Sequence, residues 1–428
     1  MNDIYSELGW RGLIHQTTDA CFLSAWLRSG SRRVYVGFDP TATSLHVGHL
    51  LPLLTLRRFQ RAGHRPIALV GGATGMIGDP SGKSEERNLL SVEELQANIA
   101  GMEGQMRRFL DFEAGDHAAL LLNNADWMRG FSYLDFLRDV GKNFPVSVML
   151  AKDSVRGRLE RAEGGMSYTE FSYMLLQAYD FVYLSQNYDC QLQVGGSDQW
   201  GNITSGIDLA RRMHGVPLYG LTCPLLTRSD GAKMGKTERG ALWLDPDRTS
   251  PYAFYQYWIN VADEDAGRCL RMLTEVEREE IERLEQSCVE HPEARGSQRR
   301  LAQEMTCRVH GTGGLASAER ATAVFFGAAI EDLSDAELVE IFADVPSREL
   351  PAAELRDQGL ALPDALVAAG LAKSKGEARR IIQQGGAYVN NRRHTDQQTC
   401  LTDADRASQT VMVLRAGKKR YALLRFTE

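Results

Sequence analysis

The first half of the chain alternates short apolar runs with amphipathic segments. Residues 34–38 form an apolar run that ends at the turn Asp39-Pro40-Thr41, which predicts a buried strand. Apolar residues recur at helical spacing over 46–62, which predicts a helix. By the same criteria we expect strands at 66–71, 118–122 and 191–195, and helices at about 92–110, 133–140 and 199–213. This alternation indicates a parallel sheet with crossover helices, and it places ligand chemistry at the carboxyl ends of the strands.

The pattern changes after Pro251. Residues 252–326 read as helices alone, and residues 331–357 carry nine acidic and two basic side chains along with two prolines. From residue 362 the pattern indicates two helices and several short strands. We therefore expect four parts, at 1–247, 248–345, 346–361 and 362–428: an α/β domain, an α-helical domain, an acidic linker and a small α+β module.

Charge divides the chain unevenly. The whole chain has a formal net charge of -7, whereas residues 363–428 carry 12 Lys and Arg against 6 Asp and Glu. An acidic body argues against a protein that coats nucleic acid along its length, but a basic tail favours a local nucleic-acid contact over a plain basic surface. The tail residues that would make it are Lys373, Arg379, Arg380, Arg392 and Arg393.

Cysteine usage and hydropathy bear on the compartment. The seven cysteines are scattered and none forms a C-x-x-C pair, which favours reduced thiols over disulfides or a zinc site. The first 16 residues lack the apolar core of a signal peptide, and no segment approaches the roughly 18 apolar residues of a membrane span. These features predict a cytoplasmic protein without a membrane partner.

Two motifs almost two hundred residues apart suggest phosphate chemistry. His46 and His49 share one face at the start of a predicted helix, where the helix dipole favours anions and imidazoles can donate to phosphoryl oxygens. Ordinary surface histidines are the alternative, and no third ligand supports a metal site. Lys233 and Lys236 lie in a glycine-containing loop, which is commonly a solvated turn but can also close on a triphosphate.

The segment 78–84 imitates a phosphate-binding P-loop and fails the pattern. The motif requires glycine where the chain has Ile77, so we reject this interpretation. The segment is better read as a turn that delivers Asp79 to a pocket, with Lys83 and Arg87 beyond it.

A polar stripe follows the predicted helix near residues 168–183. Tyr173, Gln177 and Asp180 stand at i, i+4 and i+7. The stripe could be the wet side of a helix, yet a phenol, an amide and a carboxylate together suit a zwitterionic or hydroxylated ligand. Downstream, the turn Gly195-Gly196-Ser197-Asp198 admits close approach of a ligand, although Asp198 could equally serve as a helix cap.

With these residues in view, the chain resembles the bacterial tyrosyl-tRNA synthetases, a family within the class I aminoacyl-tRNA synthetases. The resemblance runs over nearly the whole length, through Tyr-Val-Gly-Phe-Asp-Pro-Thr, His-Val-Gly-His, Gly-Asp-Pro-Ser-Gly-Lys, Gly-Gly-Ser-Asp-Gln-Trp-Gly-Asn and Lys-Met-Gly-Lys-Thr. It implies a Rossmann-like catalytic domain at 1–247, an anticodon-side helical domain at 248–345 and an RNA-binding module at 362–428. It further implies a homodimer that joins L-tyrosine to tRNA(Tyr), with ATP as substrate and Mg²⁺ accompanying ATP without a protein cage.

The resemblance also implies a role for each matching residue. The tyrosine site would comprise Tyr35, Thr74, Asp79, Asn124, Tyr173, Gln177, Asp180, Gln193 and Gln199. The ATP site would comprise Gly37, Asp39, His46, Gly48, His49, Asp198, Lys233 and Lys236. Thr41, His46, His49, Lys233, Lys236, Thr237, Lys83 and Arg87 would act in catalysis.

Three other functions fit parts of the pattern. A tryptophan-activating enzyme would not need Tyr35 with Asp180, and a catalytically silent RNA-binding relative would not need intact histidine and lysine motifs. A nucleotidyltransferase would not need the helical region and basic tail. The loop departs from the class pattern, because it has Gly235 and Thr237 where that pattern has two serines, and Gly235 cannot donate a side-chain hydrogen bond.

Overall fold

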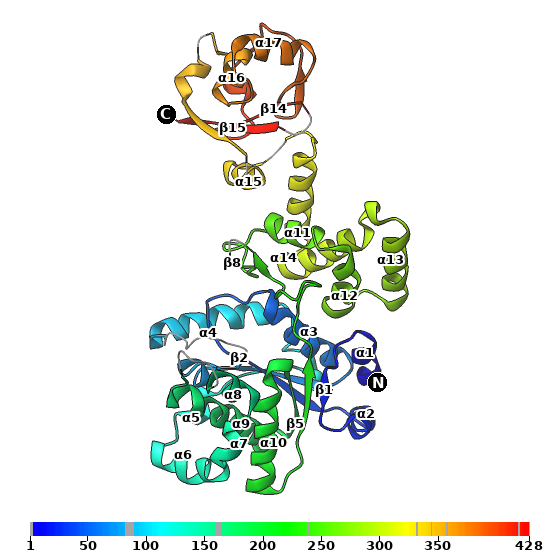
Figure 1. Cartoon of the computed structure of the whole chain (residues 1–428), viewed down its shortest axis with the longest axis vertical. Coiled ribbons are helices and arrows are strands. Elements are labelled where there is room, and N and C mark those ends of the chain that lie inside the picture. The colour runs from blue at the N-terminus through cyan, green and yellow to red at the C-terminus, as the bar shows by residue number, and fades with distance from the viewer. Residues whose placement is uncertain are drawn as a thin grey trace. The chain divides into compact units, whose positions relative to one another are not determined.

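The structure is a computed structural model, and it divides into two compact units (Figure 1). It describes residues 3–81, 90–159, 165–237, 240–330, 333–343, 345–356, 358–417 and 420–427. Unit 1 comprises residues 1–250 and 257–310, and unit 2 comprises residues 251–256 and 311–428.

Unit 1 is built on a six-stranded sheet in the order β1-β6-β5-β2-β3-β4. All neighbouring strands pair in parallel except β1 and β6, which are antiparallel. The strands are β1 (Gln16–Thr17), β2 (Arg33–Phe38), β3 (Arg65–Val70), β4 (Leu120–Asn123), β5 (Cys190–Gly196) and β6 (Tyr219–Cys223). Strand order reverses between β2 and β5, so a crevice is expected at their carboxyl ends. The predicted parallel sheet is confirmed.

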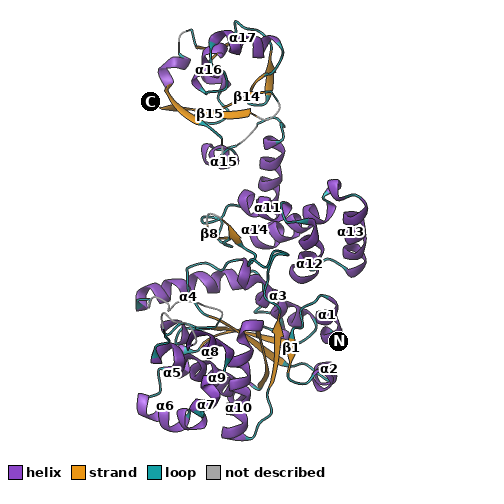
Figure 2. Ribbon diagram, in the orientation of Figure 1, coloured by secondary structure: helices purple, strands orange, loops and turns teal. Residues whose placement is uncertain are grey.

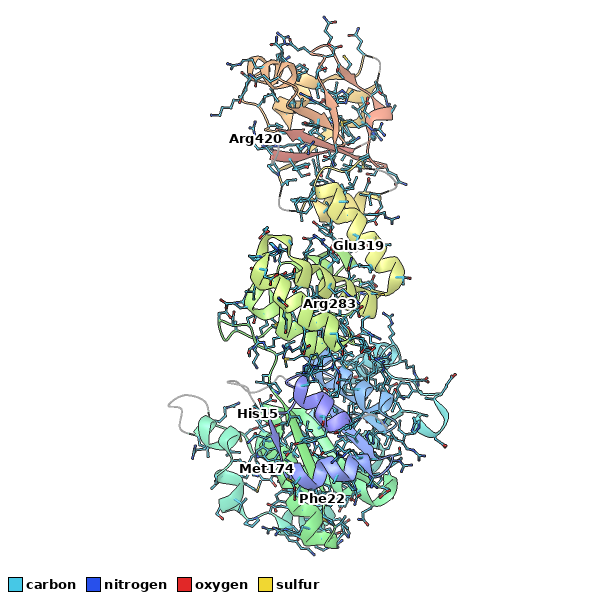
Figure 3. All side chains as sticks on the ribbon, turned by 90° about the vertical axis from the view of Figure 1, so that its right-hand side faces the viewer. His15, Phe22, Met174, Arg283, Glu319 and Arg420 are labelled. Atoms are coloured by element: carbon cyan, nitrogen blue, oxygen red, sulfur yellow. The ribbon has the colours of Figure 1, made fainter. Side chains whose placement is uncertain are left out.

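Helices lie on both sides of this sheet (Figure 2). They are α1 (Ile4–Trp10), α2 (Ala20–Arg28), α3 (Val47–Arg61), α4 (Val92–Met106), α5 (Ala125–Met128), α6 (Tyr133–Asp139), α7 (Val146–Leu150), α8 (Asp153–Leu159), α9 (Tyr168–Tyr188) and α10 (Trp200–His214). Tyr35 and Ile67 of the sheet pack with Phe181 of α9 and Leu209 of α10 in one apolar cluster. Met174, labelled in Figure 3, belongs to a second cluster that packs α7 and α8 against α9.

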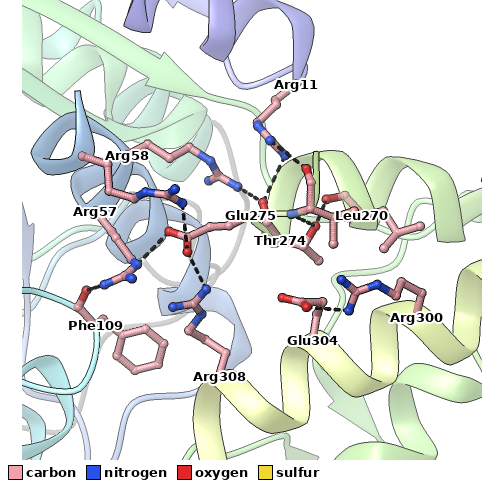
Figure 4. Close-up of polar contacts among 12 residues, drawn as sticks. Arg11, Arg57, Arg58, Phe109, Leu270, Thr274, Glu275, Arg300, Glu304 and Arg308 are labelled. Carbon is pink, nitrogen blue, oxygen red and sulfur yellow. Dashed lines mark hydrogen bonds and ion pairs between the residues drawn. The ribbon is translucent and has the colours of Figure 1, made fainter. Parts of the chain in front are cut away.

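Helix α3 is buried along most of its length and is held at its carboxyl end. Ten of its residues are buried, including Leu50 and Leu54, as its apolar spacing predicts. At its carboxyl end Arg57 donates to Glu275 Oε1 over 2.7 Å, and Arg58 donates to the Thr274 carbonyl over 2.7 Å (Figure 4). Thr274 and Glu275, which these arginines contact, lie in the short segment between α12 (Asp263–Leu273) and α13 (Arg278–Glu290). The sheet and the helical region are therefore tied together through α3.

The predicted helical stretch is present, but it does not form a domain of its own. Its helices are α11 (Pro251–Ile259), α12 (Asp263–Leu273), α13 (Arg278–Glu290), α14 (Gly296–Phe325) and α15 (Asp335–Ile341). Residues 257–310 belong to unit 1, and α14 is interrupted at Gly311, whose φ of 75° is not helical. The boundaries expected at 247 and 345 thus differ from the division that packing creates.

Unit 2 contains a five-stranded sheet in the order β12-β11-β14-β15-β9. From residue 347 on, the elements of this unit are β9 (Ser347–Pro351), β10 (Leu360–Ala361), α16 (Leu362–Ala368), α17 (Lys375–Gln383), β11 (Ala387–Val389), β12 (Arg392–His394), β13 (Cys400–Leu401), β14 (Val411–Ala416) and β15 (Arg420–Thr427). Strands β10 and β13 form a separate two-stranded sheet. Strand β9 pairs in parallel with β15, so residues 346–361 are not the linker that their acidic composition suggested. Leu355 explains the difference, because its side chain is 2% exposed and joins the core of this unit.

Candidate functional site

A cavity of about 290 Å³ opens where the strand order of unit 1 reverses. It is lined by residues from β2, β5, α9 and the loops after β2, β3 and β5. Among the residues predicted from sequence, those that line it are Tyr35, Gly37, Asp39, Thr41, His46, His49, Thr74, Asp79, Asn124, Tyr173, Gln177, Asp180, Gln193, Asp198, Gln199 and Lys233. Segments up to 198 residues apart in the sequence thus meet around one space.

Two polar atoms on neighbouring strands are buried without a partner in the described chain. Tyr35 on β2 and Gln193 on β5 face each other in the strand register. The Tyr35 hydroxyl and the Gln193 Oε1 atom make no hydrogen bond to any residue that the structure describes, although the two residues are only 1% and 3% exposed. Because buried polar atoms are nearly always paired, both atoms are suited to a polar group of a ligand.

Asp180 is the most deeply buried carboxyl group of the cavity, at 2% exposure. Its two oxygens accept from Asn124 Nδ2 over 3.0 Å and from Trp127 Nε1 over 2.9 Å. Burial raises the pKa of Asp180 to about 7, although both hydrogen bonds lower it. Burial and the nearby Asp180 carboxyl also raise the pKa of the Tyr35 phenol well above its usual value. A ligand hydroxyl here would therefore meet the neutral phenol of Tyr35 and the carboxyl group of Asp180. With a pKa of about 7, that carboxyl group can donate when protonated and accept when ionised.

Asp39 organises the part of the cavity beside this carboxyl. Its Oδ1 atom accepts from Thr74 Oγ1 over 2.8 Å, and its Oδ2 atom accepts from the Tyr173 hydroxyl over 2.8 Å. A Cβ atom built on Gly71 would lie 2.2 Å from Asp39 Oδ1. Glycine at 71 therefore leaves room for this carboxylate.

A chain of amides leads to Asp79. Gln199 Nε2 donates to Asp79 Oδ2 over 2.7 Å, and Gln177 Nε2 donates to Gln199 Oε1 over 3.1 Å. Ser81 N–H donates to Asp79 Oδ1 over 2.9 Å, which fixes the carboxylate in its turn. This group concentrates oxygen acceptors beside the cavity, as recognition of an ammonium group requires.

The two histidines cap helix α3 reciprocally. His46 Nδ1 accepts from Gly48 N–H over 3.0 Å, and His49 Nδ1 accepts from His46 N–H over 3.1 Å. In a neutral imidazole the nitrogen that accepts carries no proton, so Nε2 is the donor on each ring. The rings stack with centroids 3.9 Å apart. The two histidines thus present two Nε2–H donors at the amino-terminal end of α3, which is the positive end of the helix dipole.

Gly48 does not line the cavity, although the sequence placed it in the ATP site. A Cβ atom at this position would lie 2.8 Å from the His46 ring. Its contribution is therefore to let the imidazole fold back over the first turn of the helix. By contrast, a Cβ atom at Gly37 would meet nothing within 4 Å, so Gly37 faces open space.

The lysine loop is anchored by residues that the sequence did not reveal. Gly235 N–H donates to the Tyr257 hydroxyl over 2.7 Å, and the Cys269 thiol lies 3.5 Å from Met234 Sδ. Lys233 lines the cavity, whereas Lys236 is exposed on β7 (Lys236–Thr237), which pairs with β8 (Gly240–Ala241), and does not line it. The structure thus brings one of the two predicted lysines to the cavity.

Three predicted residues lie outside what the structure describes. Lys83 and Arg87 fall within 82–89, and the side chain of Thr237 is likewise not described. Sequence reasoning missed Trp127, which holds Asp180, and Asn202, whose side chain joins the amide chain. Trp127 stands in none of the motifs, and Asn202 stood in the quoted Gly-Gly-Ser-Asp-Gln-Trp-Gly-Asn motif without a role.

The basic residues predicted in the tail are exposed in unit 2. Lys373 precedes α17, Arg379 and Arg380 lie on α17, and Arg392 and Arg393 lie on β12. Arg393 Nε donates to the Gly385 carbonyl over 2.8 Å, so this side chain also has a structural contact. In the part of the chain that the structure describes, no helix is both long and apolar enough to cross a membrane.

Comparison with known families gives two matches that together cover most of the chain. The family described as class I tRNA synthetases (W and Y) matches residues 28–327. The C-terminal domain of tyrosine–tRNA ligases matches residues 337–424.

Known relatives are similar over the full length. A tyrosine–tRNA ligase of Rhodopirellula baltica is 62% identical, over 100% of this chain and 97% of the relative. One of Roseiflexus castenholzii is 55% identical, over 99% and 100%. A C-terminally truncated mitochondrial tyrosyl-tRNA synthetase of Aspergillus nidulans superposes with a TM-score of 0.69 and 31% identity, covering 76% of this chain and 95% of that structure.

Proposed function

The chain belongs to the class I tRNA synthetases that handle tryptophan and tyrosine, within the tyrosine–tRNA ligases, and from this premise we propose how its cavity works. The enzyme activates L-tyrosine with ATP to tyrosyl-adenylate, releasing pyrophosphate, and transfers tyrosine to the 3′ end of tRNA(Tyr), releasing AMP. One observation carries the assignment of sites. A single cavity is lined both by the polar groups suited to tyrosine and by the histidine and lysine motifs suited to ATP.

The phenolic end of tyrosine binds between Tyr35 and Asp180. The unpartnered Tyr35 hydroxyl supplies one hydrogen bond, and Asp180 supplies the other. Trp127 and Asn124 hold the Asp180 carboxyl in place from behind. Tryptophan, whose indole carries a single donor at another position, cannot pair with both groups. This is the reason to favour tyrosine over tryptophan as the substrate.

The α-ammonium group of tyrosine binds at the acceptor side of the cavity. Asp79, Tyr173 and Gln177 supply the acceptors, and Thr74, Asn124, Gln193 and Gln199 surround them. The Tyr173 hydroxyl donates to Asp39, so its oxygen lone pairs can accept from an ammonium group. With both ends held, the tyrosine carboxylate is fixed in position.

ATP occupies the side of the cavity formed by Gly37, Asp39, Asp198 and the capped start of α3. The Nε2 donors of His46 and His49, with Thr41, hold phosphate oxygens, and Lys233 and Lys236 neutralise charge that moves toward the leaving pyrophosphate. The tyrosine carboxylate then attacks the α-phosphorus in line. Catalysis by this arrangement is positioning and electrostatic stabilisation, without a covalent protein intermediate. Thr237, Lys83 and Arg87 remain predicted contributors.

Magnesium accompanies ATP and supplies charge neutralisation on the phosphates when bound. The cavity has carboxyl groups at Asp39, Asp79, Asp180 and Asp198. The first accepts from two hydroxyls, the second from an amide and a backbone N–H, and the third from an amide and an indole N–H. These donor sets suit a metal that is held mainly by phosphate oxygens and water.

Transfer to tRNA uses the basic side of unit 2. Exposed Lys373, Arg379, Arg380, Arg392 and Arg393 contact the phosphate backbone and supply salt-dependent affinity. A catalytically silent RNA-binding relative would keep this surface but would have no use for the assembled cavity. The enzyme works in the cytoplasm, with tRNA(Tyr) as its macromolecular substrate.

The enzyme works as a homodimer. Exposed apolar residues gather on α6, α7 and the start of α9, where Tyr133, Leu134, Val146 and Tyr168 are 64%, 74%, 60% and 61% exposed. The neighbouring Tyr133 side chain raises the pKa of the Tyr168 phenol, so the starts of α6 and α9 lie near each other. Exposed apolar residues of this size on neighbouring elements are typical of an interface.

Exchange of labelled pyrophosphate into ATP tests the proposed activation step. Exchange that depends on added tyrosine supports the proposal, whereas exchange that depends on tryptophan, or none with any amino acid, contradicts it.

A further inference from the structure

Asn202 places one buried amide nitrogen among four oxygens. It lies in the first turn of α10 and is 5% exposed. Its Nδ2 atom lies 2.9 Å from Gln177 Oε1, 3.2 Å from Ser81 Oγ, 3.3 Å from Gln199 Oε1 and 3.5 Å from Asp79 Oδ1. All four of these oxygens belong to residues that line the cavity where the ammonium group of tyrosine is proposed to bind. Asn202 itself does not line the cavity.

The Asp79 carboxylate, at the other end of this network, determines which way each amide in the network donates. An ionised carboxylate can only accept, so Gln199 must turn its Nε2 atom toward Asp79 and its Oε1 atom away. Gln177 then turns its Nε2 atom toward that oxygen, which leaves Gln177 Oε1 facing α10. The last position in such a chain requires a donor. Asn202 Nδ2 is that donor, and it fixes the orientation of both glutamine side chains.

Asn202 has two N–H hydrogens but four oxygen neighbours, so it cannot satisfy all of them at once. Oxygens in excess over donors are what an ammonium group, with three N–H donors, requires. Without Asn202, Gln177 could turn its amide over and place Nε2, a donor, where its acceptor Oε1 now lies. A donor there would repel the ammonium group and leave acceptors elsewhere unpaired.

We propose that Asn202 is a positioning residue that sets the direction of the Asp79–Gln199–Gln177 amide chain and thereby makes the site selective for a ligand bearing an α-ammonium group. The inference rests on the proposed tyrosine site. Asn202 acts through the two glutamines and touches neither ATP nor the phenol end of the cavity. Its effect is therefore confined to ligands that carry the amino group.

The test compares three ligands that share the phenol but differ in the other end. Tyrosine carries both ammonium and carboxylate, tyramine carries the ammonium alone, and 3-(4-hydroxyphenyl)propionate carries the carboxylate alone. The KM of tyrosine, and the inhibition constants of the other two against tyrosine, are measured by pyrophosphate exchange. The variants are Asn202→Ala, Asn202→Ser, which keeps a donor, and the control Ser205→Ala. Ser205 is buried on the same helix, and its hydroxyl donates to the Gly201 carbonyl.

In Asn202→Ala the constants for tyrosine and tyramine should rise about tenfold, as expected for loss of a buried hydrogen-bond partner. The constant for 3-(4-hydroxyphenyl)propionate should change by less than about twofold. Asn202→Ser should show the same selectivity with a smaller rise, and it decides the question if the alanine variant does not fold. Ser205→Ala should match the unaltered enzyme.

An equal rise for all three ligands, or no rise, would overturn the role of Asn202. Failure of the unaltered enzyme to exchange pyrophosphate with tyrosine would instead contradict the proposed function. The two failures are therefore distinguishable.

Discussion

Gly235 of the lysine loop lies directly against Val47 in the first turn of α3. A Cβ atom built on Gly235 would lie 2.7 Å from Val47 Cβ, and Gly235 has a φ of 75°. Backbone bonds reinforce the contact, because Val47 N–H donates to the Leu242 carbonyl and Leu242 N–H donates to the Gly235 carbonyl. Glycine at this position, which departs from the serine of the class pattern, is therefore what lets the loop lie against the helix that carries the histidines.

Gly235→Ala should weaken docking of the lysine loop on α3. The added methyl group meets Val47 and disfavours the left-handed backbone, together costing about 1–3 kcal/mol. We expect kcat for tyrosine-dependent pyrophosphate exchange to fall about tenfold or more, because Lys233 is carried by the same loop. Gly231→Ala is the matched control, since Gly231 also has a positive φ, 83°, but a Cβ there would meet nothing within 4 Å. Equal losses in both variants would contradict the role of the Val47 contact.

Glu275→Gln should destabilise unit 1. The Glu275 carboxylate accepts from Arg57 and also lies 2.5 Å from Arg308 Nη2, and its side chain is 12% exposed (Figure 4). Removing the charge leaves three guanidinium groups, those of Arg57, Arg61 and Arg308, without their carboxylate, at a cost of roughly 2–4 kcal/mol in the free energy of unfolding at pH 7. Urea denaturation measures this change in the free energy of unfolding. Glu282→Gln, at an exposed carboxylate that pairs with Arg278, should have little effect.

The same carboxylate predicts how stability depends on pH. Burial raises the pKa of Glu275, but its arginine partners outweigh that effect and bring it to about 2, below the ordinary 4.5. A folded-state pKa below the unfolded value stabilises the fold above about pH 4.5, and this contribution is lost as the pH falls toward 2. The difference in stability between the unaltered protein and Glu275→Gln should therefore shrink over that window. A difference that stays constant from pH 7 to pH 3 would contradict this account.

Arg379→Glu should impair tRNA charging while sparing amino-acid activation. Arg379 is exposed on α17 of unit 2 and is not among the residues that line the cavity. Reversing one phosphate-binding charge should lower kcat/KM for charging about tenfold at moderate salt, and it should reduce the salt dependence. Arg348→Glu is the control, because Arg348 is exposed on β9, at the opposite edge of the sheet from β12. Deleting 362–428 would be a poorer test, since it removes the partner strand of β9.

Leu134→Asp should convert the enzyme to a monomer or weaken its dimer. Leu134 is 74% exposed on α6, within the apolar patch that α6, α7 and α9 share. A buried, unpaired carboxylate in an interface costs several kcal/mol, and sedimentation at micromolar concentration would detect the change. Val289→Asp is matched in kind, because Val289 is 84% exposed but lies on α13. A monomeric unaltered enzyme, or a Leu134→Asp variant that dimerises as well as the original, would contradict the proposal.

The sequence predicted the elements that are periodic and the site residues that stand in motifs. Val34–Phe38 and the helix after His46 were found because their apolar spacing reflects burial, and most motif residues meet in one cavity because parallel strands end at the same edge. The predicted linker was wrong because composition cannot reveal pairing: β9 is ordered by β15, far along the chain.

Contacts that depend on tertiary packing escaped prediction for the same reason. Trp127 and Asn202 act through hydrogen bonds to residues 53 and 25 positions away, and no local pattern signals either one. The reciprocal histidine cap and the Gly235–Val47 contact also required coordinates, because each depends on where a ring or a loop turns in space.

Pyrophosphate exchange in the unaltered enzyme and in Tyr35→Phe tests the central claim most directly. Tyr35→Phe removes only the buried hydroxyl that has no partner in the described chain. The account predicts rapid exchange with tyrosine and little with phenylalanine or tryptophan in the unaltered enzyme. In Tyr35→Phe the preference for tyrosine over phenylalanine should fall about tenfold, because one hydrogen bond to the phenol is lost. Exchange driven by tryptophan, or an unchanged preference in Tyr35→Phe, would contradict it.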